Sequence, residues 1–474
     1  MPAIVEIPQV VADALAEFAD LFANQPQRRH FGEYLTGLMV ASNKTVSGIQ
    51  ADFVETTDQS CLNRFLTRVD WDVHALNARR LEWLQTDPAT RYHEQGVIAL
   101  DDVLIDHDGK RIEDVGWFWD HAEDRHKIAH DYLFANYVCP SGKHYPLEFR
   151  RFKKREQCAA TGETFEDHGV LFRQLVDWVC EQEIPGDFTF DSYFSSAADL
   201  NHIHSKQNAH GESRAYVGDL KTNRKIEVRG RSIRVDEFAA TIDREQRKEL
   251  RRGDQRQWYF TTTVRLPQVK HPVRIVLLWK NRRDQGVTKV LITNRTRWEI
   301  NRILQTYRER WTGTETFHRD GKQELGMGDC QLRSGQGQTR HMYLVMLAYS
   351  LLMRQLKHPS AKEWAIERLM TIGQACRAVA TETLRTTLAW AIEQVAENFR
   401  KPQHVIAPGE RVVCILTGHQ LKDPTATVAY HTADQAEFNR VLGSRGVNRA
   451  AFANRAVQVE NNLDEIIRAI ELNS

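Results

Sequence analysis

Apolar residues recur at helical spacing through the first forty residues of the chain. Between residues 8 and 40, apolar side chains lie three, four and seven positions apart, which favours amphipathic helices over strands. The positions are Val11, Leu15, Phe18, Leu21, Phe22, Phe31, Leu35, Leu38 and Met39. The N-terminal region is therefore expected to be helical.

Residues 43–71 have the pattern of two short helices joined by a tight turn. The sequence predicts a helix near 45–53 and a second helix near 59–68, with Asp58 as its N-cap. This is helix-turn-helix spacing, and the second helix would present polar side chains able to contact base edges and phosphates. These side chains are Gln59, Ser60, Asn63, Arg64 and Arg68. A plain helical hairpin packed in a bundle has the same spacing, so both interpretations stay open.

From about residue 96 the pattern changes to short apolar and alternating runs, which are typical of strands. The first such runs are 97–100, 130–138, 145–152 and 188–190, with a helix expected from about Phe165 to Gln182. Further alternating runs at 225–235, 257–266, 274–279 and 289–293 indicate an inserted β-rich segment. A strongly apolar helix is expected at 341–356.

These changes of pattern divide the chain into five expected regions. They are a helical domain with the helix-turn-helix (1–95), the first part of an α/β core (96–200), a β-rich insertion (201–285), the second part of the core (286–358) and a C-terminal helical region (359–474). Within the last region, residues 400–410 break the helical pattern, and a short strand is expected at 412–416.

The composition is that of a soluble globular protein with several cores. The chain has 474 residues, 41% hydrophobic and 27% charged, so two to four domains are expected. No apolar run reaches about 18 residues and the N-terminus lacks a signal-peptide pattern, so a cytoplasmic location is expected. The seven cysteines lack the paired spacing of a zinc site. Because the net charge is only +1, any nucleic-acid binding has to come from local basic patches.

Three acidic residues stand in contexts typical of metal-dependent phosphoryl transfer. Asp102 and Asp191 follow short apolar runs, and Glu315 lies in a segment predicted to be helical. Divalent cations such as Mg²⁺ take oxygen ligands, and two of them ~3.5–4 Å apart stabilise the attacking and leaving oxygens of a displacement. Strand alternation lets only one of Asp101 and Asp102 face a given side, without deciding which. Taken alone, each aspartate also fits a purely structural role, Asp102 at the end of a strand and Asp191 as a helix N-cap.

The segment around Glu315 has the most specific pattern. On an ideal helix Lys322 and Arg308 each lie about 20° around from Glu315, and Tyr307 lies roughly 80° away. One helix face would thus carry a carboxylate flanked by cations and an aromatic hydroxyl, which suits the binding of phosphates on both sides of a scissile bond. A solvated charged face with ordinary i,i+4 pairs is the alternative.

Together these segments resemble a known family. LDDV at 100–103, FDSYFS at 190–195, and YRERW followed by ETFHRDGKQELG within 307–326 are similar, in this order, to the motifs of bacterial insertion-sequence DDE transposases of the insertion-sequence-four-like type. The resemblance covers roughly residues 30–355 and selects Asp102 over Asp101. It implies an α/β fold in which an RNase H-like catalytic core is interrupted by a β-rich insertion, with a helical DNA-binding region before it and a helical C-terminal region after it.

The resemblance also implies the chemistry and the partners. Asp102, Asp191 and Glu315 would bind two Mg²⁺ ions, for which Mn²⁺ can substitute, to cut DNA and join the 3′-hydroxyl ends to target DNA. The expected partners are double-stranded DNA, as terminal inverted repeats and as target, and a second copy of the chain; no membrane is expected. A location in a bacterial cytoplasm, on the nucleoid when bound to DNA, is implied. A nuclease of the same fold without strand transfer, and a DNA-binding protein that no longer cuts, are the alternatives.

Tyr307, Arg310 and Lys322 would, by the same resemblance, hold the DNA end beside the metals. Four residues rather than the usual three separate Arg310 from Glu315, so on a regular helix Arg310 would point about 140° away. Either the helix is irregular near Gly313, or Arg308 takes over the phosphate contact. An aromatic residue that stacks on a flipped base in this family has no clear counterpart here, since Lys289 stands where a tryptophan would be sought, with Trp258 and Trp279 nearby.

Overall fold

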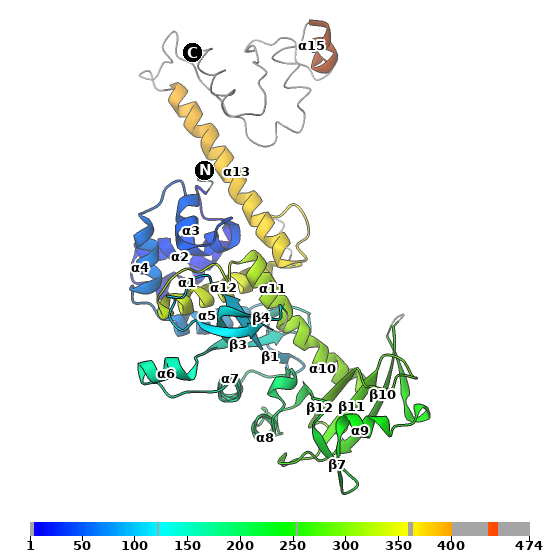
Figure 1. Ribbon diagram of the computed structural model, residues 1–474. Helices are drawn as coiled ribbons and strands as arrows, with labels where there is room; N and C mark the ends of the chain where they lie inside the picture. Colours follow the sequence, from blue (N-terminus) through cyan, green and yellow to red (C-terminus); the bar gives the residue numbers. More distant parts are fainter. Residues whose placement is uncertain (1–3, 121–122, 253–254, 359–363, 401–434, 444–474) are drawn as a thin grey trace. The chain divides into compact units, whose positions relative to one another are not determined.

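The computed structural model describes residues 4–120, 123–252, 255–358, 364–400 and 435–443, in two units, Met1–Trp390 and Ala391–Ser474 (Figure 1). The first unit holds the sheet and the acidic residues. Helix α13 (Ile372–Arg400) begins in the first unit, and α15 (Gln435–Val441) lies in the second. The break expected at 400–410 and the strand expected at 412–416 lie almost entirely among residues outside those described, from 401 onwards.

The N-terminal region is helical, as the apolar spacing predicts. Its elements are α1 (Gln9–Phe18), the 3₁₀ turn η1 (Ala19–Leu21), α2 (Gln25–Val40), α3 (Val46–Asp52), α4 (Gln59–Thr67) and α5 (Val73–Gln85). Asp58 accepts a hydrogen bond from the Ser60 backbone N–H at 2.8 Å and so caps α4. The predicted pair of short helices and its N-cap are therefore confirmed.

The described strands of the α/β part form one mixed sheet. Along the sheet the strands are β2 (Gly116–Asp120), β3 (Arg125–Val138), β1 (Val97–Asp106), β5 (Asp187–Phe190), β6 (Tyr216–Asp219), β12 (Lys289–Thr293), β11 (Val273–Trp279), β10 (Gln255–Val264) and β9 (Lys248–Arg252), and β4 (His144–Phe152) also pairs with β3. Strand β1 is antiparallel to β3 and parallel to β5, and β5 is parallel to β6. This mixed arrangement is consistent with the RNase H-like core expected.

Strand β1 is longer than its apolar run suggests. Its pairing with β3 continues from Val97 to Asp106, whereas its pairing with β5 ends at Leu100. Asp101 and Asp102 both lie within the strand, as the argument from strand alternation assumes, and the strand extends beyond them to Asp106. The backbone stays extended because β3 supplies hydrogen-bond partners on one side after β5 has ended on the other.

The β-rich segment continues the same sheet instead of forming a sheet of its own. Strand β6 pairs with β5, and β12 pairs with β6, so strands from both sides of the expected boundaries join one surface. A small hairpin of β7 (Lys225–Val228) and β8 (Arg231–Arg234) is followed by α9 (Val235–Ala240) and η3 (Arg244–Gln246). The boundaries expected at 200 and 285 do not coincide with breaks in the sheet, and the division into domains stays a prediction.

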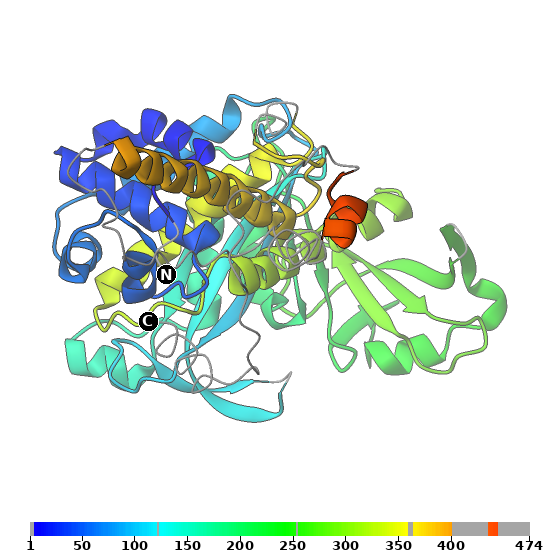
Figure 2. The same cartoon turned by 90° about the horizontal axis from the view of Figure 1, so that it is seen from above.

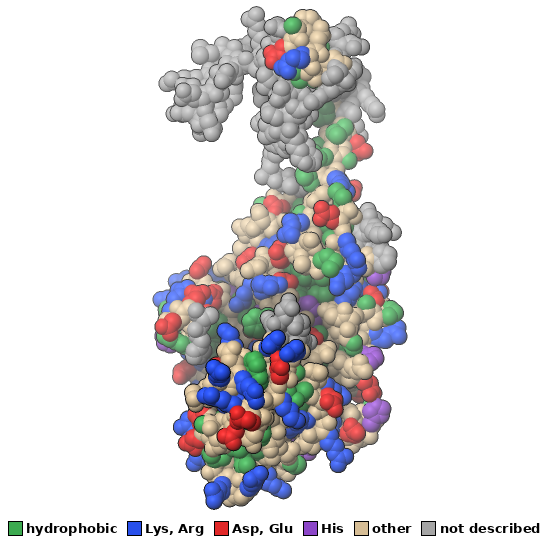
Figure 3. Space-filling model, turned by 90° about the vertical axis from the view of Figure 1, so that its right-hand side faces the viewer, with side chains coloured by type: hydrophobic (Ala, Val, Ile, Leu, Met, Phe, Trp, Pro, Cys, Tyr) green, Lys and Arg blue, Asp and Glu red, His purple; other side chains and the backbone are tan. Residues whose placement is uncertain are grey.

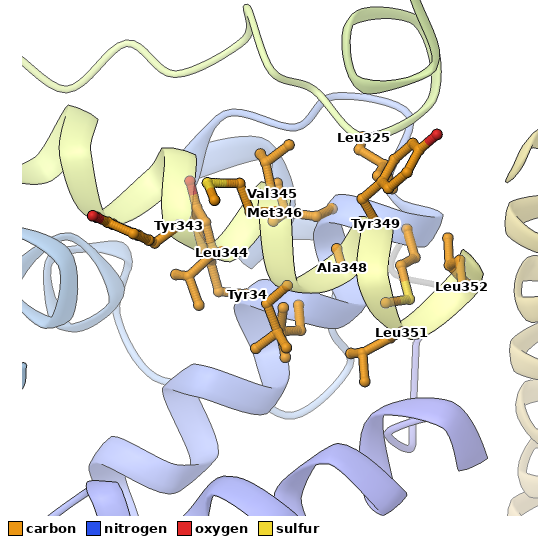
Figure 4. Close-up of a cluster of buried hydrophobic side chains, with 14 of the residues drawn as sticks. Tyr34, Leu325, Tyr343, Leu344, Val345, Met346, Ala348, Tyr349, Leu351 and Leu352 are labelled. Atoms are coloured by element: carbon orange, nitrogen blue, oxygen red, sulfur yellow. The ribbon is translucent and has the colours of Figure 1, made fainter. Parts of the chain in front are cut away.

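One face of the sheet is covered by the N-terminal helices together with α11 (Glu315–Glu324) and α12 (Gly335–Gln355). Helix α12 is buried almost all round, and its apolar side chains cluster beside Tyr34 of α2 (Figure 4). Tyr34 of α2 shares a hydrogen bond with His341 of α12 at 2.9 Å. The N-terminal helices thus share one core with the sheet and α12.

The opposite face of the sheet carries a second core. It is formed with α7 (His168–Glu181) and α8 (Ala197–Ser205) and extends along β11 and β12 into the β-rich end, which projects to one side of the helical layer (Figure 2). Helix α6 (Arg155–Thr161) and the 3₁₀ turn η2 (Ser192–Phe194) lie in the connections around α7. Among the described helices, none combines the length and apolar character that crossing a bilayer requires.

The close approach of α10 (Ile300–Gly313) to the sheet depends on a glycine. A Cβ atom built on Gly313 would lie 2.8 Å from Val138 Cγ2 and 3.1 Å from Ala99 Cβ. Since neither neighbour is a flexible side chain, the helix has to move away from the sheet if a methyl group is added.

Gly313→Ala is expected to lower the free energy of unfolding by about 1–3 kcal/mol, because overpacking outweighs the gain in helix propensity. Gly286→Ala is the control, since no atom lies within 4 Å of its built Cβ. Urea denaturation followed by circular dichroism measures both variants. Equal stability of the two would contradict the proposed close packing.

Candidate active site

The register of β1 and β5 places two aspartates side by side. Leu100 pairs with Phe190 in the parallel ladder, so the next residues, Asp101 and Asp191, lie level with each other at the carboxyl end of β5. Asp191 keeps an extended backbone, with φ −82° and ψ −176°. Ligand sites of open α/β sheets commonly lie at this end of parallel strands.

Asp101 faces the side of the sheet that α10 and α11 cover. Its partner across β3 is Phe134, whose ring packs on Phe317 of α11 with centroids 5.2 Å apart. Arg310 donates a hydrogen bond to Asp101 Oδ2, and the Thr314 hydroxyl donates to the same oxygen at 3.2 Å. The Asp101 carboxylate is thus buried and already paired.

Burial raises the pKa of Asp101 to about 7, against the opposing charge of Arg310. The carboxylates of Asp102, Asp191 and Glu315 add to this rise, so all three lie within electrostatic range of Asp101. A carboxyl group surrounded in this way by further acids and one arginine is typical of functional sites.

Asp102 points to the opposite face of the sheet, because successive side chains of a strand alternate. Its partner across β3 is Leu133, which belongs to the core under α7. Its charged neighbours are Asp131, Asp191 and His168, and His168 Nε2 lies 2.8 Å from Asp131 Oδ2. Although Asp102 is accessible to solvent, loss of hydration and these two acids raise its pKa to about 6.

Glu315 is the first residue of α11, directly after a one-residue interruption at Thr314. Thr314 has φ −100° and ψ −62°, and the hydrogen bonds from Thr314 N to Arg310 O and from His318 N to Thr314 O keep the two helices in line. The predicted irregularity near Gly313 is confirmed. The irregularity was expected to swing Arg310 toward Glu315, but Arg310 pairs with Asp101 of the sheet, and Glu315 is not among its main charged neighbours.

The three acids selected from the sequence, Asp102, Asp191 and Glu315, are not gathered into one group. Within the described residues, no set of three or more His, Cys, Asp or Glu side chains has an arrangement that can hold a metal ion. Asp191 Oδ1 accepts the backbone N–H of Tyr193 at 2.8 Å, as an N-cap does. Asp191 is near both Asp101 and Asp102, whereas Glu315 is on the side of Asp101.

The other residues of the signature helix lie around these acids. Tyr307 is half-buried, and its hydroxyl lies 3.0 Å from Lys289 Nζ, which also pairs with Asp219 at 3.1 Å. Arg308 is exposed. Lys322 is exposed on α11, with Glu315 among its charged neighbours.

A basic cavity of about 660 Å³ lies between α10 and the β-rich end of the sheet. Its lining contains five cations and no acid, as well as the exposed Trp311. The lining residues are Leu250, Arg256, Gln257, Lys280, Thr288, Lys289, Leu304, Tyr307, Arg308, Arg310 and Trp311. Lys and Arg side chains are spread over the lower part of the molecule in Figure 3, with some acids between them. Such a combination of cations and an aromatic ring suits a nucleic-acid strand.

Of the tryptophans considered for base stacking, Trp279 is fully buried with the Arg247 guanidinium 4.2 Å above its ring, and Trp258 is its partner on β10. Sequence reasoning did not single out Trp311, although it lies within the YRERW motif. Its only signal was its position four residues after Tyr307 on the same helix.

Asn63, Arg64 and Arg68 lie away from these acids. They line a separate cavity beside α4 together with residues 331–334. The pair of short helices expected from the sequence and the expected acids thus lie at different places in the first unit.

The family model described as DDE superfamily endonuclease matches residues 17–226. The matched stretch contains Asp101, Asp102 and Asp191, whereas Glu315 lies beyond it. No match was found among curated proteins. The similarity supports an enzyme of the DDE endonuclease or transposase type, a class that acts on DNA and generally uses divalent metals.

Arg310→Met is expected to destabilise the protein more at about pH 8 than at about pH 5.5. Arg310 lowers the pKa of Asp101, so its removal raises this pKa further above about 7, and the folded variant keeps Asp101 protonated at about pH 8, where the wild type releases the proton. This difference in proton binding should cost the variant about 1.4 kcal/mol more at about pH 8 than at about pH 5.5. Urea denaturation at both pH values measures it, and the added change Asp101→Asn should remove most of the pH dependence. A loss that is the same at both pH values would contradict the ion pair.

Proposed function

We propose that the chain is a DDE transposase of the insertion-sequence-four-like type, which binds transposon ends, cuts DNA and joins the 3′-hydroxyl ends to target DNA. The family match supports the DDE class, and the three acidic motifs in order, with the irregular YRERW helix, support the transposase type. The observation that carries the proposal is that Asp101 of β1 and Asp191, directly after β5, lie level at the end of the parallel pair, while Glu315 lies within electrostatic range of Asp101.

We further propose that Asp101 takes the place of the first acid, which the resemblance assigns to Asp102. Asp101 is on the face of α10 and α11, and Glu315 contributes to its electrostatic environment but is not among the main charged neighbours of Asp102. Asp102 remains close to Asp191 and is the alternative. The two candidates are neighbours in the sequence, but their side chains lie on opposite faces of the sheet.

The chemistry of the Asp101, Asp191 and Glu315 side chains suits Mg²⁺, with Mn²⁺ as substitute, because all three are carboxylates and both ions prefer oxygen ligands. Their arrangement in the described structure does not yet form a metal-holding group, so the three carboxylates would have to come closer together. Asp101, Asp191 and Glu315 would hold the ions once Arg310 releases Asp101. When bound, such ions activate the attacking oxygen and stabilise the leaving oxygen.

The protein's own groups would bind and position the DNA. Arg310 lines the basic cavity and also contacts Asp101, so its guanidinium is placed to exchange this carboxylate for a phosphate. Tyr307, Arg308 and Lys289 line the same cavity and would bind the backbone on either side of the scissile bond. Lys322, near Glu315, would bind a phosphate on the other side of the acids.

The partners proposed are terminal inverted repeats, target DNA and a second copy of the chain, which a synapse of two ends requires. The same proposal includes a dimer that brings the two ends together. It also includes a location in the bacterial cytoplasm, and on the nucleoid when the protein is bound to DNA. Recovering inverted repeats from the DNA that flanks the gene would supply the substrate for the experiments below.

Asp101→Asn, Asp191→Asn and Glu315→Gln are each expected to abolish cleavage of end DNA in Mg²⁺, by a factor of at least about 10³, while DNA binding is retained, because each removes a metal ligand. Asp102→Asn is the matched control and should keep most of the activity. Gel assays of cleavage and fluorescence anisotropy of binding measure the two properties. If Asp102→Asn is inactive and Asp101→Asn active, the first acid is Asp102.

Pre-cut ends separate the transposase from a nuclease. The wild type should join a pre-cut 3′-hydroxyl end to a target plasmid in Mg²⁺, and the Glu315→Gln variant should not. Cleavage without joining would identify a nuclease of the same fold, and binding without either reaction would identify a DNA-binding protein that no longer cuts.

Mg²⁺ is expected to raise the melting temperature, because it relieves the repulsion among Asp101, Asp191 and Glu315. At 100 times the dissociation constant a ligand adds about 2.7 kcal/mol to the stability. Differential scanning fluorimetry with Mg²⁺, and with Na⁺ at equal ionic strength, measures the shift. A similar rise in the Asp191→Asn variant would show that the ions bind elsewhere.

A further inference from the structure

A second basic cavity, of about 610 Å³, lies between α4 and the segment that leads into α12. One wall consists of Ser60, Asn63, Arg64, Thr67 and Arg68, and the other of Gln331, Leu332, Arg333 and Ser334. The two walls are more than 260 residues apart in the sequence. No acid is among the lining residues.

The two walls are held in place by buried contacts. Arg340 of α12 donates hydrogen bonds to the Phe65 and Leu66 carbonyls at the end of α4, and to the Trp71 carbonyl at 2.9 Å. Gln338 donates to the Cys330 and Leu332 carbonyls at 3.0 and 2.8 Å. Both residues are buried on α12, so one helix positions both sides of the cavity.

Close packing also brings the walls together. A Cβ atom built on Gly337 would lie 2.9 Å from Leu332 Cδ1 and 3.1 Å from Thr67 Cγ2, so the start of α12 directly touches α4. The outward polar side of α4 therefore faces residues 331–334. A helix that reads bases in the major groove needs this side free.

Three arginines supply the charge of the cavity. Arg64, Arg68 and Arg333 are exposed, and no ion pair with an acid is formed by any of them within the described residues. Arg64 donates only to Ser60 Oγ and Cys61 Sγ, both at 3.1 Å. By contrast, Arg151 nearby is paired with Asp114 at 2.7 Å. The three guanidinium groups are thus free to bind an anion.

The start of α12 itself does not supply the anion site. Its Gly335 N–H donates to Glu113 Oε2 at 2.7 Å, and its Gly337 N–H donates to Ser334 Oγ at 3.4 Å. Since these backbone donors are used, an anion in the cavity would bind to the arginine side chains and to the hydroxyl and amide groups of Ser60, Asn63 and Thr67.

We propose that this cavity binds the phosphate backbone of double-stranded DNA between α4 and residues 331–334, with Arg333 as a DNA contact. The proposal rests on DNA being the substrate of the protein. In this proposal α4 and the segment before α12 together position the duplex by binding its phosphates. Base reading belongs to another part of the chain.

The test is binding of Arg333→Gln to two duplexes, one with the terminal repeat and one of unrelated sequence, between about 50 and 200 mM salt. Loss of one phosphate contact should weaken binding to both duplexes several-fold and lower the salt slope by about 0.9. Arg68→Gln should behave in the same way. Arg91→Gln is the matched control, because Arg91 is an exposed arginine outside both basic cavities.

Binding and slope unchanged in Arg333→Gln and Arg68→Gln would overturn the proposal. So would a loss confined to the terminal repeat, since this would show base reading instead of backbone binding. The melting temperature of each variant shows whether it is folded. The test does not depend on the catalytic proposal. The change Arg333→Gln can be made in the Glu315→Gln protein, and its effect on DNA binding can be measured there without any cutting.

Discussion

The ion pair between Arg310 and Asp101 joins the two parts of the structure on which the candidate site depends. Asp101 lies on the central strand β1, and Arg310 lies on α10, one turn before the helix is interrupted at Thr314. Gly313 allows α10 to approach Ala99 and Val138 closely beside this pair, and the Thr314 hydroxyl lies 3.2 Å from the same carboxylate oxygen. Removing two charges from water is costly unless they are paired. The strand register that sets the face of Asp101 and the interruption of the helix before Glu315 thus meet at one buried contact.

The sheet separates two acidic environments that neighbour each other in the sequence. Asp101 shares a face with Arg310 and α11, and Asp102 shares the other face with Asp131 and His168. Asp191, at the end of β5, is near both. Because Arg310 is bound to Asp101, it keeps this carboxylate from other ligands. Under the function proposed above, metal binding by Asp101 and phosphate binding by Arg310 would favour each other. The two events would be coupled because Arg310 both contacts Asp101 and lines the basic cavity.

The near-neutral net charge conceals two basic cavities at different places in the first unit. Many cations are used inside the fold: Arg80 and Arg340 bind carbonyls in the core, and Arg247 stacks on Trp279. Other cations line the cavities beside α10 and beside α4, where Arg310 and Lys289 of the first cavity are also paired with Asp101 and Asp219. Phosphate binding of this kind depends on local charge, which a summed charge over the whole chain does not reveal.

The sequence by itself determined the local elements, because apolar periodicity, N-caps such as Asp58 and the extra residue before Glu315 act over a few positions. It therefore predicted the N-terminal helices up to α4, α7, α12, most strands and the irregularity near Gly313, but not the helices α5, α6, α8 and α9. The tertiary structure alone decided which aspartate faces Glu315, since strand alternation leaves both choices open until α10 and α7 occupy their faces. It also decided that β6 and β12 extend one sheet and that Arg333 lies opposite Arg64, because these pairings join residues far apart in the chain, for which no local pattern exists.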